Sequence, residues 1–343
     1  MEIRFGIFDH LERRDVPLAT LYEERLQLLA AADAAGIYCY HLAEHHATPL
    51  GCAPSPGIFL SAVAQRTRRI HLGPLVYLLP LYHPMRLVEE ICMLDQLSGG
   101  RFEIGVGRGI SPFELAHFDV NFLGARDIFE ESLRVIVAGL RERKLSHKGT
   151  HYRFNNAPIE IRPRQEPNPP FWYGTSTPDG LLFAARHGMN IVAGGPNKVV
   201  AGVAQVFREQ REQYRDGPEN LNPQVAVPIV GAVRHFFAAD TDREAMEIAR
   251  PAYKTYYANI TKLWRDHGTV PTMFTDDLDL ACNHDAAIVG SASTVREKVA
   301  QYFQETGCNY LVLSFAWGGL SHEQSLRSLD TFTSKVMPEF AGR

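Results

Sequence analysis

The stretch Gly36-Ile-Tyr-Cys-Tyr-His-Leu-Ala-Glu-His-His46 joins a short apolar β-run to an acid and two imidazoles. A helix is predicted before it, over residues 21–35, and a loop rich in Pro and Gly follows it, from Pro49 to Gly57. In α/β proteins, ligands and catalytic groups collect at the carboxyl ends of strands. Imidazole is also the side chain best suited to proton exchange near neutral pH. Because loop residues are commonly just solvated, this stretch alone leaves a catalytic and a solvated interpretation open.

The same alternation of β-run and helix continues along the chain. Strands are predicted at 3–8, 37–42, 69–79, 102–106, 170–174, 190–193, 225–237 and 309–315. Helices are predicted at 21–35, 55–66, 84–98, 125–143, 178–188, 197–214, 241–262, 293–306 and 321–337. Eight β-runs, each followed by a helix, predict an α/β fold of the (β/α)8 TIM barrel class with insertions, in a single domain over residues 1–343. A doubly wound open sheet is the alternative.

Two features favour the barrel over the open sheet. No change of composition marks a domain boundary, and the alternation reaches the end of the chain. Polar residues also follow several predicted strands, namely Asp9-His10, Glu44-His45-His46 and Arg108. In a barrel such residues converge on one mouth, whereas an open sheet spreads them along an edge.

Two segments interrupt the rhythm. Residues 146–163 contain two short extended pieces around Asn155-Asn156, which predict a hairpin inserted beside the main sheet. Residues 264–290 lack clear periodicity, and a stretch of that length without regular structure predicts a lid or active-site excursion.

Composition excludes several classes of function. The 35 basic and 39 acidic side chains give a net charge of −4, which offers no basic face for nucleic acid or an anionic membrane. No apolar run approaches the roughly 18–20 residues of a membrane span, and the first residues lack a signal peptide's order. The five cysteines are scattered and odd in number. They predict reduced thiols in a cytoplasmic protein, without a zinc site or a disulfide frame.

Two glycine-containing strand ends are candidate anion sites. Gly105, Gly107 and Gly109 could let the backbone approach a phosphate, with Arg108 as a forked cation. The spacing is not that of a dinucleotide fingerprint, and a tight turn packed under the barrel is the structural alternative. After Phe171–Gly174, the hydroxyls of Ser176 and Thr177 precede a predicted helix, where each could bind phosphate or simply cap the helix.

His45 and His46 are poorly placed to bind one metal together. Neighbouring side chains of an extended chain point to opposite faces, and no third ligand with metal spacing accompanies them. No G-x-S-x-G elbow supports a serine nucleophile. Acid–base or hydrogen-bonding work is therefore the better hypothesis. The apolar run from Gly73 to Pro84 suits an aromatic ring system lying over it, although barrel core is the default interpretation.

Eight stretches, in order, carry a family resemblance. They are Ala-Asp-Ala-Ala-Gly36, Ala-Glu-His-His46, the segment from Leu79-Pro80 to His83-Pro84, Leu-Asp-Gln-Leu-Ser-Gly-Gly-Arg-Phe102, Gly-Val-Gly-Arg-Gly109, Ala-Ala-Arg-His-Gly188, Val289-Gly290 and Val-Met-Pro338. Along nearly its whole length the chain thus resembles the bacterial luciferase-like family of flavin-dependent oxidoreductases.

The resemblance implies a flavin-dependent monooxygenase of the two-component type. Such a barrel binds reduced FMN (FMNH2) at the strand carboxyl ends and activates O2 as a flavin 4a-peroxide, which oxygenates a small organic substrate. A separate flavin reductase supplies the reduced flavin at the expense of NAD(P)H. The resemblance also implies a homodimer.

Site residues follow from the same resemblance, position by position. His45 corresponds to the catalytic histidine, with Glu44 and His46 beside it. Arg108, Arg126 and the Ser176-Thr177 turn match phosphate-contacting positions, and Leu75-Val76 matches a non-prolyl cis peptide under the flavin ring. The predicted substrate-pocket residues rest on position in the chain instead: His10, Tyr82 and Trp317 lie near the ends of predicted strands, and Ile110 follows the glycine run around Arg108.

Departures from the family pattern narrow this expectation. Gly107 stands where the luciferase α subunit has a cysteine, so neither light emission nor the aldehyde substrate is expected. Two alternatives stay open: hydride transfer with F420 or NAD(P)H on the same barrel, and a non-catalytic flavin-binding or partner subunit. The residues at 42–46 lack the signs of the F420 branch and favour FMN. The sequence does not name the substrate.

Overall fold

Parallel strands form the centre of the computed structural model, which describes residues 2–269 and 271–340. These strands are β1 (Arg4–Asp9), β2 (Cys39–Leu42), β3 (His71–Pro74), β4 (Tyr77–Leu78), β5 (Ile104–Gly107), β8 (Phe171–Gly174), β9 (Asn190–Ala193), β10 (Val230–Ala239) and β12 (Tyr310–Ser314). Their order is β3-β2-β1-β12-β10-β9-β8-β5-β4. Because β3 and β4 follow one another in the chain, and Leu72 also bridges to Phe102, the order closes on itself. The predicted barrel is confirmed.

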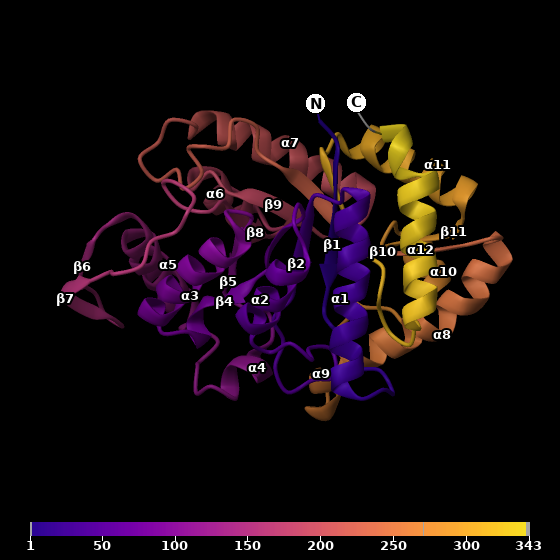
Figure 1. Cartoon of the computed structure of the whole chain (residues 1–343), viewed down its shortest axis with the longest axis horizontal. Coiled ribbons are helices and arrows are strands. Elements are labelled where there is room, and N and C mark those ends of the chain that lie inside the picture. The colour runs from indigo at the N-terminus through magenta and orange to yellow at the C-terminus, as the bar shows by residue number, and fades with distance from the viewer. Residues whose placement is uncertain (1, 270, 341–343) are drawn as a thin grey trace.

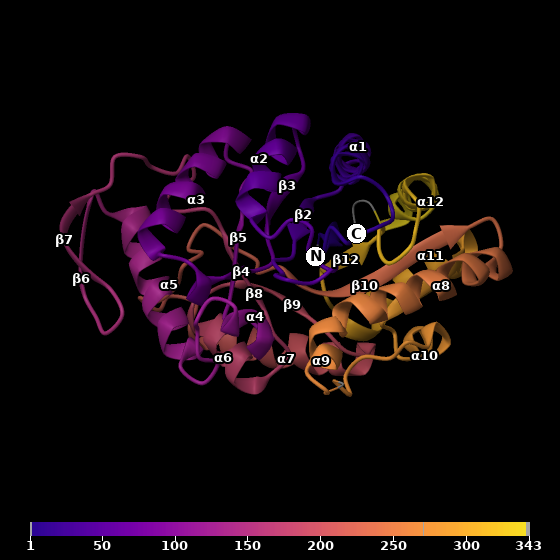
Figure 2. The ribbon, with the colours of Figure 1, turned by 90° about the horizontal axis from the view of Figure 1, so that it is seen from below.

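Helices surround the barrel on its outside (Figures 1 and 2). The longer ones are α1 (Leu18–Ala35), α2 (Pro56–Arg66), α3 (Pro84–Ser98), α5 (Ala125–Arg141), α6 (Pro178–Arg186), α7 (Asn197–Gln213), α8 (Asp242–Ile260), α11 (Ala292–Thr306) and α12 (His322–Lys335). Short elements between them are η1 (Leu79–Leu81), α4 (Pro112–Ala116), α9 (Lys262–Asp266), α10 (Leu278–Asn283) and η2 (Met337–Phe340). Among the residues described, no helix has the length and apolar character needed to cross a membrane.

Local sequence sets where these helices begin and end. Proline occupies the first helical position of α2, α3 and α6, where its missing N–H costs no hydrogen bond. Gly36 ends α1 with φ +88°, a left-handed conformation that suits glycine, and its N–H donates back to Ala32. This turn sends the chain directly into β2 and its polar end.

The barrel interior has an apolar layer and a polar floor. The apolar layer contains Leu75, Trp172, Val192, Val312, Phe8, Val76 and Val233. At the amino ends of the strands lies the buried Glu103, which accepts hydrogen bonds from Tyr38 Oη (2.6 Å) and Trp172 Nε1. His71 Nδ1 lies 2.9 Å from the same carboxylate. The floor is therefore closed by a charged network, opposite the mouth where the candidate site lies.

The inserted hairpin consists of β6 (Lys144–Lys148) and β7 (Arg153–Pro158), which project from one edge of the molecule (Figure 2). Its turn is at residues 149–152, so the expectation of a turn at Asn155-Asn156 is wrong, since both lie within β7. The physical reason is Glu131 of α5. Its buried carboxylate accepts the backbone N–H groups of Thr150, His151 and Tyr152 at 2.8–3.2 Å.

Replacing Glu131 by alanine is expected to loosen this hairpin, because those N–H groups lose their acceptor. Hydrogen bonds to charged groups contribute about 1.5–3 kcal/mol each, of which solvent would recover part. We expect the free energy of unfolding to fall by about 2 kcal/mol, and amide exchange at 149–152 to accelerate. Burial by itself would raise the pKa of Glu131, but the backbone N–H donors outweigh burial and lower this pKa to about 2. The stabilisation should therefore be lost as pH falls from about 4.5 towards 2. Glu142→Ala, at an exposed position after α5, is the control.

The segment 264–290 has more regular structure than the irregular excursion expected there. It contains α10 and β11 (Ala287–Ser291), and β11 pairs in parallel with the second half of β10. In Figure 2, β10 is the long arrow that runs outward from the barrel. Because of that pairing, β10 extends as far as Ala239. At its other end β10 begins only at Val230, after Pro228, which has no N–H to donate to a neighbouring strand. The predicted bounds 225–237 are therefore displaced.

Candidate active site

The chain beyond β2 is held by the buried carboxylate of Glu44. This carboxylate accepts the backbone N–H of Leu78 at 3.0 Å, and His46 Nε2 lies 2.9 Å from its other oxygen. Burial raises the pKa of Glu44 above its ordinary value. The contacts tie the end of β2 to β4 and fix the imidazole of His46. That ring packs against Phe118, with centroids 4.7 Å apart, and does not line the cavity described below.

A second carboxylate, Glu114, orients His45. Ser111 accepts the N–H of Glu114 at 3.2 Å and so begins α4. One oxygen of Glu114 lies 3.1 Å from His45 Nδ1, and the other accepts the N–H of His46 at 2.9 Å. Burial raises the pKa of Glu114, but these hydrogen bonds outweigh it, and the net pKa lies below the ordinary range. An ionised carboxylate only accepts, so Nδ1 carries the proton and Nε2 is the nitrogen available for other work.

His45 lines a cavity of about 720 Å³ at the carboxyl ends of β1, β2, β4, β5 and β8. Nine of the predicted site residues share this cavity: Glu44, His45, Leu75, Val76, Arg108, Ile110, Arg126, Ser176 and Thr177. One wall is apolar, and the peptide bond Leu75–Val76 in it is cis, as predicted. Gly107 faces this wall, and a Cβ there would lie 2.4 Å from Val76 Cγ2. The absent side chain therefore lets β5 lie close to the cis segment.

The other end of the cavity offers groups suited to an anion. Arg108 stacks over Phe122 at 4.6 Å, and its one hydrogen bond among the described residues is a long contact of 3.5 Å to Gly109 O. Thr177 caps α6 by accepting the N–H of Gly180 at 3.3 Å, and Ser176 Oγ bonds with the backbone of Gly194. Arg126 is paired with Glu130 at 3.0 Å. Both guanidinium groups keep their terminal N–H donors unused, but among the described residues only that of Arg126 has a carboxylate partner.

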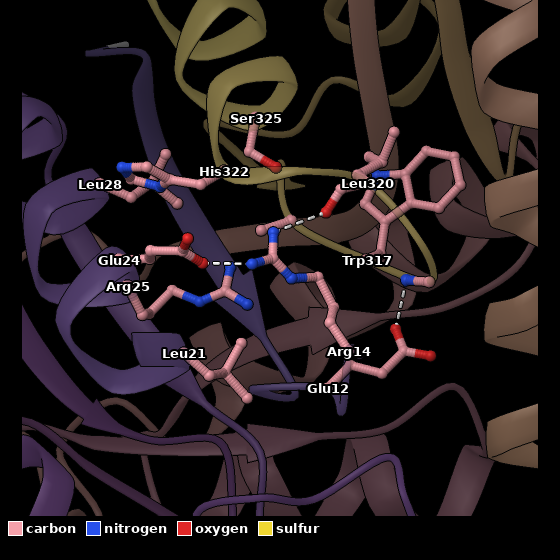
Figure 3. Close-up of a pocket in the computed structure, with 12 residues that line it drawn as sticks. Glu12, Arg14, Leu21, Glu24, Arg25, Leu28, Trp317, Leu320, His322 and Ser325 are labelled. Carbon is pink, nitrogen blue, oxygen red and sulfur yellow. Dashed lines mark hydrogen bonds and ion pairs between the residues drawn. The ribbon is translucent and has the colours of Figure 1, made fainter. Parts of the chain in front are cut away.

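Three further predicted residues lie outside this cavity. His10 packs behind His45, with ring centroids 5.4 Å apart, and Tyr82 packs edge-on against Tyr77. Trp317 is buried and donates to Phe236 O at 3.2 Å. It lines a much smaller cavity of about 20 Å³, shown in Figure 3, between the β1–α1 loop, α1 and the segment leading into α12.

Glu12 lies in the small cavity of Figure 3 and connects three segments. Its carboxylate accepts from Asn259 Nδ2 at 2.6 Å and from the backbone N–H of Gly318. Burial raises its pKa to about 7 despite these bonds. The folded state therefore binds this proton more tightly than the unfolded state does.

Stability should consequently fall as pH rises from about 4.5 through 7, because the folded state keeps a proton that the unfolded state has released. A shift of this size corresponds to about 3 kcal/mol. Urea unfolding at several pH values would measure it, and Glu12→Gln should flatten the dependence. Glu2→Gln, at an exposed position, should leave it unchanged. An unchanged slope in Glu12→Gln would refute this prediction.

Glu114 is the principal site residue that sequence reasoning missed. Its signal was weak: an acid three residues after Ser111, which indicated a helix start and nothing about His45. Tyr173, Phe8 and Phe129 also line the cavity, as does Met273 from the 264–290 segment. Across residues 2–269 and 271–340, no three His, Cys, Asp or Glu side chains are grouped to hold a metal ion.

Known proteins resemble this chain over its whole length. The family model described as luciferase-like monooxygenase matches residues 3–310. The uncharacterized protein y4wF of Sinorhizobium fredii is 38% identical over 98% of this chain and 97% of its own. The oxygenase component of flavin-dependent trigonelline monooxygenase from Acinetobacter baylyi is 26% identical, covering 99% and 96%. The crystal structure of monooxygenase RslO1 from Streptomyces bottropensis superposes with a TM-score of 0.88 at 24% identity, covering 99% and 100%, and shows a common fold.

Proposed function

The chain belongs to the luciferase-like monooxygenase family, and from this premise we propose that it is the oxygenase component of a two-component system. It would take reduced FMN from a separate NAD(P)H-dependent flavin reductase and use O2 to oxygenate a small organic molecule. The observation that carries the proposal is that one cavity contains both the His45 imidazole, which Glu114 orients, and the Arg108 guanidinium, which makes only one long hydrogen bond among the described residues. The trigonelline monooxygenase relative, itself an oxygenase component, supports the need for a reductase.

The residues of the cavity fit FMN. The volume of the cavity lies within the range of about 300–1,000 Å³ that is typical of ligand sites. Arg108, Ser176, Thr177 and the N–H groups at the start of α6 would hold the phosphate, with Arg126 at the edge. Leu75, Val76 and the side-chain-free Gly107 would meet the flavin ring. When bound, reduced FMN would supply the electrons that activate O2.

The protein's own contribution is proton handling and the exclusion of water. His45 Nε2 can take up or release a proton, because Glu114 stabilises the imidazolium through Nδ1. Glu44 and His46 hold the backbone that carries His45, and so act as positioning residues. The apolar wall keeps water away from the reacting atoms. Homodimer formation and a cytoplasmic location stay predictions.

Arg108→Ala is expected to weaken reduced FMN binding by about 10–100-fold, because a charge-assisted hydrogen bond to phosphate contributes about 1.5–3 kcal/mol. Anaerobic titration of the purified protein would measure the affinity. Arg134→Ala, on the exposed face of α5 and outside the cavity, is the matched control.

Oxygenation itself would be tested by supplying reduced FMN and O2 with a panel of small organic compounds, and seeking products that have gained one oxygen atom. Binding of F420 in place of FMN, with reduction of a substrate and no O2 uptake, would instead establish the hydride-transfer alternative. Flavin binding without any turnover would establish a non-catalytic role.

A further inference from the structure

A layer of polar side chains lies on the inner face of the barrel, one step above its apolar layer. Side chains alternate along a strand, so residues two apart share a face. His10, His235 and Ser314 lie two residues after Phe8, Val233 and Val312, respectively, which belong to the apolar layer. Parallel pairing aligns His235 of β10 with Ser314 of β12. His10 lies next to His45, and it shares the neighbour Tyr256 with His235.

The hydrogen bonds of this layer are incomplete. His235 Nε2 and Ser314 Oγ are both shielded from solvent, and neither has a hydrogen-bond partner among the described residues. A buried polar atom without a partner is costly, and such atoms are uncommon in folded proteins. Two of them on paired positions of adjacent strands point to a ligand that completes their bonds.

The layer has aromatic walls and an open side. Around His235 pack Tyr256, Trp317 and Tyr253, with ring centroids 4.2, 5.2 and 5.5 Å away. His235 nevertheless keeps partial exposure, as do Phe8 and Val233 beneath it. His10 packs against both Phe8 and His45, which line the large cavity, so the layer borders that cavity.

The chemistry of the layer selects an uncharged ligand group. Burial lowers the pKa of both His10 and His235, the latter to about 4, so both imidazoles are neutral near pH 7. Arg234, next to His235 in the chain, is bound to Asn197 and stacked over Tyr302, and Arg25 and Arg14 are paired with Asp9 and Glu24. A carboxylate or phosphate would find no counter-charge here, whereas a carbonyl or hydroxyl oxygen would find both donors and acceptors.

We propose that His235 and Ser314, with His10 beside them, form a substrate subsite that binds the carbonyl or hydroxyl oxygen of a neutral cyclic compound. The aromatic side chains around His235 hold the ring of that compound, and the hydrogen bonds turn its carbon skeleton towards His45. The inference rests on the proposed function, since it specifies the substrate class of the same active site.

The test uses three probes that share one ring: p-cresol, toluene, which lacks the hydroxyl, and benzoate, which is charged. Dissociation constants would be measured by titration of the protein with and without saturating FMN, following tryptophan fluorescence and ligand NMR. The wild-type chain should bind p-cresol at least tenfold more tightly than toluene, and more tightly than benzoate. Ser314→Ala and His235→Asn should each reduce the p-cresol preference to below threefold, with toluene binding unchanged.

Ser325→Ala is the matched control. Ser325 Oγ is also buried without a partner among the described residues, but it lines the small cavity of Figure 3 instead of the barrel mouth. This variant should keep the full p-cresol preference. Equal binding of p-cresol and toluene by the wild type, a preference that survives in both subsite variants, or tighter binding of benzoate would overturn the inference.

The outcome for the flavin separates this inference from the proposed function. Reduced FMN affinity would be measured on the same proteins. Normal FMN binding without a p-cresol preference would reject the subsite alone. A p-cresol preference that depends on His235 and Ser314 in a chain that does not bind reduced FMN would reject the proposed function alone.

Discussion

Replacing His45 by glutamine should lower the rate of substrate oxygenation by about 10²–10⁴-fold, the range that a positioned general acid or base contributes. The reason is geometric: His45 Nδ1 is bound to Glu114, so Nε2 is the group at the cavity surface that can exchange a proton. Product formed per reduced FMN supplied would be measured, using a substrate from the oxygenation screen. FMN affinity should change by less than a few fold, because the groups proposed to hold the phosphate are other residues of the cavity, Arg108, Ser176 and Thr177.

Two variants sharpen that prediction. Glu114→Gln removes the charge that stabilises the imidazolium, and should cost about 10–100-fold in rate while shifting the pH profile. His46→Gln should cost less than tenfold, because His46 bonds to Glu44 and does not line the cavity. Equal losses in His45→Gln and His46→Gln would show that both act through folding, and an unchanged rate in His45→Gln would reject its proton role.

The fold was predictable because its signals are local and repeated. Each β-run and helix is set by apolar periodicity and by turn residues such as Gly36, and eight repeats leave few possible topologies. The errors occurred where a distant side chain decides the outcome. The hairpin turn depends on Glu131, which lies 19 residues before Thr150. The regular end of segment 264–290 depends on the pairing of β11 with β10.

The site was predictable in its strand-end groups and unpredictable in its supporting contacts. The strand-end position of Glu44-His45-His46 and the glycine run around Arg108 identified one mouth, and the cavity does bring His45 and Arg108 together. Glu114 could not be assigned to His45, because 69 residues separate them. Likewise, the pairing of His235 with Ser314 requires the strand register, which no local pattern encodes.

The floor of the barrel gives the largest expected effect on stability. Glu103→Leu should lower the free energy of unfolding by about 3–5 kcal/mol, the usual cost of removing one partner from a buried charged network. The substitution leaves Tyr38 Oη and Trp172 Nε1 without their acceptor, and removes the carboxylate that lies 2.9 Å from His71 Nδ1. Urea unfolding, followed by circular dichroism, would measure the change.

Glu103→Gln distinguishes charge from shape in this network. Its amide oxygen can still accept one hydrogen bond, so it should recover part of the loss seen with leucine. Glu23→Gln is the control, since its pair with Arg66 is exposed to solvent and should leave the free energy of unfolding nearly unchanged. A loss below about 1 kcal/mol in Glu103→Leu would show that the network adds nothing beyond packing. Because Glu103 lies at the opposite end of the barrel from His45, reduced FMN affinity in the folded variant should match that of the wild type.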